Sequence, residues 1–160
     1  MPNDYILLWS VRISLLAYVA NIALLATNRH ESLRRWINLS GVVLIVVHVI
    51  WAYASHDFSH SKALQQTATD TQQTLGFEFA AGIYFNHLFV LLWMLEVMGD
   101  WTRFAFRPRV RLALHGYLML IAFNGAIVFE NGATRWIGLV VIVALGGLVM
   151  SQRRRRPIEE

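Results

Sequence analysis

The chain has no cysteine among its 160 residues and few charged residues. Without cysteine it can have no disulfide scaffold, no thiol catalyst and no zinc or iron–sulfur site built on cysteine ligands. Charged residues are 15% of the sequence and hydrophobic residues 56%, whereas a soluble domain usually has about 25% charged and about 45–50% apolar residues. The composition therefore excludes an ordinary soluble protein and predicts a chain that lies mostly in a membrane.

Five apolar runs, separated by charged residues, account for most of the hydrophobic content. Each run approaches the length of about 20 residues that a helix needs to cross a bilayer. Continuous apolar runs favour helices over the alternating strands of a membrane barrel. We predict an all-α polytopic membrane protein, a bundle of about five transmembrane helices in one domain at residues 1–152, followed by a basic tail at 153–160. The predicted spans are 5–26, 36–54, 77–98, 112–129 and 136–150.

Basic residues indicate the direction of these spans. Most arginines lie between the first and second runs, between the third and fourth, or after the fifth, whereas the other side has only Lys62 and Arg135. The positive-inside rule then places the N-terminus outside and the C-terminus in the cytoplasm of a bacterial inner membrane. The arginines at 153–156 follow a span directly, which favours a role in topology or contact with anionic lipid rather than nucleic acid.

One outer loop, residues 55–76, is long enough to form structure of its own. Ser59 is a typical N-cap residue, and Leu64, Ala68 and Leu75 follow with approximately helical spacing. We predict a short helix that lies on the membrane surface.

Polar side chains recur at one depth in four of the predicted spans. Counting about 1.5 Å per residue from the outer end of each span places them roughly 8–13 Å below the outer surface. Polar groups at this depth are costly, and they often serve function. Asn21, Glu96 and His115 are expected close enough to the cytoplasmic ends to be wetted or paired with nearby arginines. The pattern thus predicts a working site in the outer leaflet, with Arg12, His48, Asn86, His87 and Asn124 in its polar layer.

Histidines make this layer a candidate metal site. If the second helix continues past Ala54, His48, His56 and His60 share one of its faces, and imidazole suits Zn, Cu or Fe. The proposed ligands are these three histidines and His87. Arg12, Asn86 and Asn124 would support the site, and Glu78 or Glu130 at its mouth would relay protons. The spacing of His56 and His60 lacks the glutamate of a metalloprotease motif, so a solvated histidine pair remains the alternative.

His48 and His87 have a second interpretation as axial ligands of one b-type haem, with Arg12 beside a propionate. The alternative is that both histidines hold helices together by hydrogen bonds to backbone or asparagine neighbours. Arg12 would then extend towards the outer aqueous phase or face an anionic lipid or substrate. The residues alone leave these possibilities open.

A scattered set of residues in the middle of the chain resembles a group of small bacterial membrane proteins. The set is His48, His56-Asp-Phe-Ser-His60, Thr67-Ala68, Thr71, Gly82, Tyr84, Asn86, Phe89 and Trp93, and the resemblance covers about a third of the chain. This group is uncharacterised, so the resemblance implies a membrane fold with its outer face as the working surface, and no activity.

Three functions remain open on the sequence. The first is redox chemistry or metal handling at the outer histidines. The second is an accessory subunit without chemistry, packed against a larger membrane complex through the third and fifth spans, the fifth having small residues such as Gly138 and Gly146. The third is a small transporter or channel, which would need to be a homo-oligomer. No sequence motif identifies an enzymatic reaction.

Overall fold

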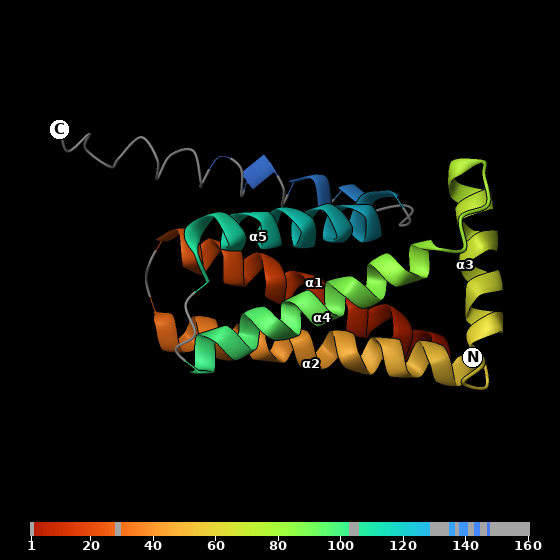
Figure 1. Cartoon of the computed structure of the whole chain (residues 1–160), viewed down its shortest axis with the longest axis horizontal. Helices are drawn as coiled ribbons and strands as arrows, with labels where there is room; N and C mark the ends of the chain where they lie inside the picture. The colour runs from red at the N-terminus through yellow and green to blue at the C-terminus, as the bar shows by residue number, and fades with distance from the viewer. Residues whose placement is uncertain are drawn as a thin grey trace.

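The protein is all-α, as predicted. The computed structural model describes residues 2–27, 30–102 and 106–128, and scattered residues between 135 and 147. The helices are α1 (Pro2–Thr27), α2 (Glu31–Ser55), α3 (His60–Leu75), α4 (Gly82–Thr102) and α5 (Pro108–Phe123), and α5 continues into a π-helical turn, η1 (Asn124–Val128). Four helices, α1, α2, α4 and α5, lie alongside one another, and α3 lies across one end of the bundle (Figure 1).

Within the described residues, four helical segments are long and apolar enough to cross a membrane. They are Tyr5–Thr27, Glu31–Ser55, Gly82–Thr102 and Pro108–Ile127. Large apolar side chains such as Leu16, Val43 and Leu91 are exposed on their outer surfaces, which suits contact with lipid. The chain is therefore a multi-pass membrane protein. The predicted fifth span, 136–150, lies largely outside the described residues, and the basic tail lies wholly outside them.

Several predicted boundaries differ from the structure in a way that matters for the site. The third span was expected at 77–98, but α4 starts at Gly82 and continues to Thr102. Residues 77–81 instead form a connection held to α3, where the Phe79 amide donates to Thr71 Oγ1 at 2.8 Å. The second and fourth spans start earlier than predicted, at Glu31 and Pro108. These shifts bring residues taken as loop charges, Arg34 among them, into the helices.

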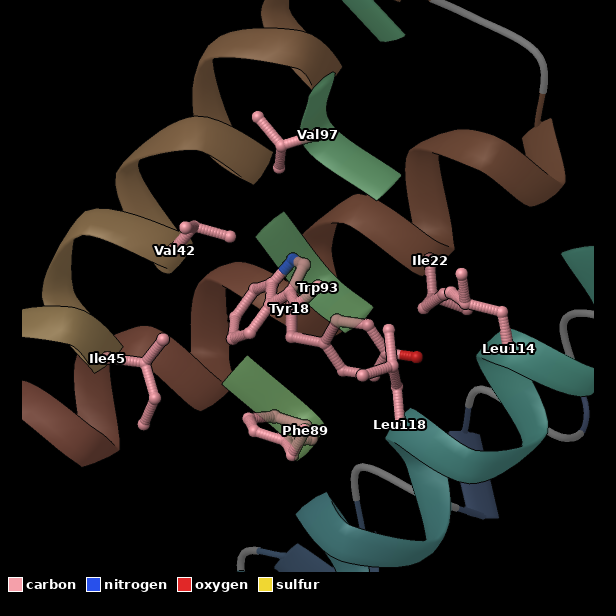
Figure 2. Packing of buried hydrophobic residues seen from close by; sticks show 9 residues of the cluster. All are labelled: Tyr18, Ile22, Val42, Ile45, Phe89, Trp93, Val97, Leu114 and Leu118. Atoms are coloured by element: carbon pink, nitrogen blue, oxygen red, sulfur yellow. The ribbon is translucent and has the colours of Figure 1, made fainter. Parts of the chain in front are cut away.

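The core lies where α4 crosses the closely packed pair α1 and α2. Figure 2 shows Trp93 of α4 beside Tyr18 of α1, with apolar side chains from α2 and α5 around them. The Trp93 and Tyr18 rings meet edge to face at 5.1 Å between centroids. Gly41 of α2 leaves room for Trp93, because a Cβ there would lie 2.7 Å from the indole. Ser14 of α1 donates to the Gly41 carbonyl at 2.8 Å, which fixes the same contact.

Helix α3 confirms the short helix predicted in the outer loop. Ser59 is its N-cap, as predicted, and Gly76 ends it in the left-handed conformation, with φ 83°. The side chains that it buries are Ala63 and Thr71, whereas Leu75 of the predicted apolar stripe is exposed. The Thr71 hydroxyl donates to the Thr67 carbonyl of the same helix. Threonine can therefore lie on the packed face of the helix without an unpaired hydrogen-bond donor.

The two ends of the bundle differ in what they carry. At one end, called the α3 end below, α3 lies across the other helices (Figure 1). The opposite end is called the loop end. It contains the last turns of α1 and α4 and the first turns of α2 and α5.

Candidate functional site

Polar and charged side chains gather inside the bundle near the loop end, and all four candidate spans contribute to them. Asn21 and Asn38 are fully buried, and Glu96 is only 2% exposed. We call this group the loop-end cluster. It consists of Asn21 from α1, Arg34 and Asn38 from α2, Glu96 and Asp100 from α4, and Arg111 and His115 from α5.

A two-point ion pair joins α2 to α4 in this cluster. Arg34 Nη1 and Nη2 each donate to one carboxylate oxygen of Asp100, both at 2.7 Å. Arg34 Nη1 also donates to Asn21 Oδ1 at 3.2 Å, so the same guanidinium reaches α1. Such paired, charge-assisted bonds are short and geometrically specific. Arg34 is thereby held in one orientation among three helices.

Asn38 connects this ion pair to the apolar core. Its Oδ1 accepts from the Trp93 indole at 2.7 Å. Its Nδ2 donates to Glu96 Oε2 at 2.5 Å and is 3.2 Å from Asp100 Oδ2. One amide thus satisfies the buried indole and orients both carboxylates, which a side chain lacking either a donor or an acceptor could not do.

The second oxygen of Glu96 has a different environment. Glu96 Oε1 lies 3.8 Å from His115 Nε2, 3.8 Å from Arg111 Nη2 and 4.0 Å from Arg34 Nη1. These separations are too long for direct hydrogen bonds. Within the described residues, both Glu96 Oε1 and His115 Nε2 are buried without a hydrogen-bond partner. Buried polar atoms are nearly always paired, so two facing unpaired atoms mark the chemically distinctive point of the cluster.

Tyr18 completes the surroundings of His115. The Tyr18 hydroxyl lies 3.4 Å from both His115 Nδ1 and the His115 carbonyl oxygen. The other ring nitrogen, Nε2, faces Glu96. An imidazole that contacts a hydroxyl on one side and a carboxylate on the other can accept or release a proton without moving far.

The sequence places these residues together through helical spacing. Arg34 and Asn38, Glu96 and Asp100, and Arg111 and His115 are each four residues apart, so each pair shares one helix face. Three such pairs lie in neighbouring helices near the same end of the bundle. This recurrence is the signal by which the sequence could have revealed Arg34, Asn38, Asp100 and Arg111, none of which was predicted as a site residue.

The sequence predicts a polar site in the outer leaflet, whereas the structure has a buried polar cluster at the loop end. Pairing with nearby arginines, one of the two alternatives expected for Asn21, Glu96 and His115, is confirmed for Asn21, which accepts from Arg34, and for Glu96, which Arg34 and Arg111 approach. The other alternative, contact with water, does not apply to Asn21 and Glu96, because both side chains are buried. The α4 helix runs beyond them to Thr102, and Arg34 and Asp100 cover them on the side of the loop end. The largest connected buried polar group among the described residues is thus at the loop end and not in the predicted outer layer.

His48, placed in the predicted outer layer, instead contacts α1. Its Nδ1 lies 2.9 Å from the Leu7 carbonyl oxygen and 3.4 Å from Ser10 Oγ. Ser10 in turn donates to the same carbonyl at 3.1 Å. These contacts match the alternative in which His48 holds two helices together.

The predicted face of three histidines does not form. Helix α2 ends at Ser55, and Asp57 and Phe58 both have the left-handed φ of 54°, so the chain turns sharply before α3. His56 caps α2 and His60 starts α3. Lys62 pairs with Asp57 across this turn and lowers the pKa of that carboxyl. The reason for the error is the turn, which breaks the helical register between His56 and His60.

His60 and His87 are nevertheless brought to the same pair of tyrosines at the α3 end. His60 Nδ1 lies 3.0 Å from the Tyr53 hydroxyl, and its Nε2 lies 3.1 Å from the Tyr84 hydroxyl. The His87 ring is 5.7 Å from the Tyr53 ring and 6.5 Å from the Tyr84 ring between centroids. This group therefore joins α2, α3 and α4 at the α3 end of the bundle.

The remaining predicted site residues are dispersed. The Arg12 guanidinium lies over the Trp9 ring at 5.9 Å, Asn86 and Glu78 are exposed, and Asn124 caps α5. Glu130 lies outside the described residues. Among the described residues, no group of three or more His, Cys, Asp or Glu side chains is placed to hold a metal ion. Metal or haem at the four histidines stays a prediction.

Comparison with known proteins adds no identification. No protein family, curated protein or solved structure matches the chain. The geometry of the chain itself is therefore the basis for proposing what the protein does.

Proposed function

We propose that this multi-pass membrane protein binds and releases a proton at Glu96 and His115, within the loop-end cluster. The observation that supports the proposal is that Glu96 Oε1 and His115 Nε2 face each other at 3.8 Å, buried and without other hydrogen-bond partners in the described part of the chain. One proton held between them, after a small side-chain movement or through a bridging water, would satisfy both atoms.

The charges around this pair allow its protonation to change. With His115 neutral, the cations Arg34 and Arg111 balance the carboxylates Glu96 and Asp100. The neighbours contributed by α1, Tyr18 and Asn21, carry no charge at neutral pH. An added proton gives the cluster one net positive charge, and its loss restores neutrality. Asp100 is held as a carboxylate by both donors of Arg34, so the exchanging proton is assigned to Glu96 and His115.

The cluster has a route to water at the loop end. The Arg111 side chain is 37% exposed, whereas those of His115 and Asp100 are 12% and 11% exposed. Exposure thus falls from Arg111 towards Glu96, and a proton can enter beside Arg111. Trp93, Leu118 and Tyr18 are buried in the bundle centre on the other side of the cluster.

Infrared difference spectra of the full chain, recorded between acidic and basic pH, test this proposal. We expect a carbonyl stretch from a protonated carboxylic acid that disappears as the pH rises and is missing from Glu96→Gln. Glu78→Gln is the matched control, because Glu78 is an exposed glutamate at the opposite end, and it should retain the band.

Two results would count against the proposal. One is a Glu96→Gln spectrum identical to that of the unmodified chain, and the other is loss of the same band in Glu78→Gln. Either would leave the loop-end cluster as a network that only holds helices together. The accessory-subunit interpretation would then be favoured, and the search for stoichiometric partner chains would be the next step.

We also retain the proposal of a transition metal or haem at the outer histidines. What supports it is the convergence of His60 and His87, from separate helices, on Tyr53 and Tyr84, because imidazole is a ligand that Zn, Cu and Fe share. Metal analysis and an optical spectrum of protein purified without a His-tag test it. Stoichiometric metal that is lost in His60→Ala, or a Soret band that is lost in His87→Ala, supports the proposal, and a colourless, metal-free protein contradicts it.

A further inference from the structure

A pocket on the outer surface of the bundle at the loop end is separate from the loop-end cluster. It has a volume of about 340 Å³ and lies between the start of α2 and the end of α4. Its lining residues are Glu31, Ser32, Arg35, Trp36 and Trp101. No residue of the proposed proton site lines it, so the pocket is a second, distinct place for a ligand.

Two tryptophans form the apolar part of this pocket. Trp36 of α2 and Trp101 of α4 meet edge to face, 5.1 Å apart between ring centroids. They remain 57% and 45% exposed, although their helices are candidate membrane spans. Both lie within two turns of a helix end, which is the depth of lipid headgroups. Exposed indole faces at that depth can attract a cation.

The polar part of the pocket carries one charge of each sign. Arg35 pairs with Glu31 one turn earlier on α2, yet the Glu31 side chain remains 68% exposed and that of Arg35 37% exposed. Both groups thus retain surface for a further partner. A zwitterionic headgroup offers the complementary arrangement, with a phosphate for the guanidinium and an ammonium for the carboxylate and the indole rings.

We propose that this pocket binds the headgroup of a zwitterionic phospholipid, with its ammonium group between Glu31 and the Trp36–Trp101 pair and its phosphate on Arg35. An anionic lipid such as phosphatidylglycerol offers the phosphate but lacks the ammonium. The site therefore selects for the ammonium group and does not simply attract negative charge.

Native mass spectrometry of the full chain in detergent, titrated with dihexanoyl phosphatidylethanolamine or dihexanoyl phosphatidylglycerol, tests this assignment. We expect one phosphatidylethanolamine to remain bound more tightly than phosphatidylglycerol. Trp101→Ala should weaken phosphatidylethanolamine binding by about 2- to 30-fold, the range of a cation–π contact. Glu31→Gln should weaken phosphatidylethanolamine binding and leave that of phosphatidylglycerol unchanged.

Trp9→Ala is the matched control, because Trp9 is an exposed tryptophan in the first third of α1, the helix that starts at the α3 end (Figure 1), and the change should leave lipid binding unchanged. Equal binding of the two lipids by the unmodified chain would overturn the assignment of the ammonium site. An equal loss of binding in Trp9→Ala and Trp101→Ala would overturn the assignment to this pocket, and so would the absence of bound phosphatidylethanolamine.

Discussion

Single residues in the first turns of α2 have sharply different roles although they are neighbours in sequence. Arg34 is buried and donates to Asp100 and Asn21. Arg35 lies on the outer surface and pairs with Glu31 within the same helix. A buried charge that loses its partner is costly, whereas an exposed pair contributes little. The two arginines therefore form a natural matched pair for measuring what the loop-end cluster contributes.

Arg34→Ala should lower the free energy of unfolding by about 3–5 kcal/mol, because it removes the guanidinium that donates to both oxygens of the largely enclosed Asp100 carboxylate. Arg35→Ala should lower it by less than about 1 kcal/mol, because that pair is solvated. Unfolding of both variants in mixed micelles of dodecyl maltoside and sodium dodecyl sulfate measures the difference. Similar losses in the two variants would show that the ion pair of Arg34 and Asp100 does not stabilise the bundle.

At the scale of whole helices, the packing of α1, α2 and α4 depends on one small residue. The Trp93 ring occupies the space where Gly41 has no side chain. The indole also donates to Asn38, one turn before Gly41 on the same helix. The contact between Trp93 and Gly41 thus sets how closely α4 approaches α2. The same indole orients Asn38 in the loop-end cluster.

Gly41→Ala should destabilise the bundle by about 1–3 kcal/mol, since the new methyl group would overlap the Trp93 ring and force repacking. Gly116→Ala on α5 is the control, because no described atom lies within 4 Å of the position of its Cβ. Alanine there should leave stability unchanged or raise it by up to about 1 kcal/mol through helix propensity. The same micelle unfolding experiment compares them. A Gly41→Ala variant as stable as the Gly116→Ala variant would contradict the packing argument.

The elements were more predictable from the sequence than the site. Apolar runs determine the helices, because only a helix satisfies its own backbone in lipid, and Ser59 located the start of α3. The site is harder to predict, because charges near the ends of the apolar runs have the pattern of loop residues although they lie inside the helices. Arg34 and Asp100 neutralise each other inside the bundle, and a hydropathy pattern cannot distinguish such a pair from two solvated charges. Likewise, the left-handed turn at Asp57 and Phe58 has no glycine to indicate it.

At the scale of the whole molecule, the distribution of arginines predicts that the loop end faces the cytoplasm and the α3 end faces outward. The chain has no cysteine, so single introduced cysteines can test this orientation without background. Ser61 on α3 and Arg109 on α5 are exposed positions near opposite ends.

In intact cells, a membrane-impermeant maleimide should label Ser61→Cys, and it should label Arg109→Cys only after the cells are permeabilised. The reason is that the predicted topology places α3 outside and the start of α5 in the cytoplasm. The reverse labelling pattern would mean that the loop end, and with it the entry to the loop-end cluster, faces outward.

The proposed function requires that Glu96 and His115 share an exchangeable proton. Nuclear magnetic resonance of the full chain in nanodiscs can observe both groups, with ¹³C-labelled glutamate and ¹⁵N-labelled histidine followed through one pH titration. Glu96→Gln and His115→Gln assign the two signals. We predict that the Glu96 carboxyl and the His115 ring shift together with a common midpoint, because strongly interacting groups titrate as a pair. Signals that stay constant over the whole titration, or that shift independently with unrelated midpoints, would contradict a shared proton.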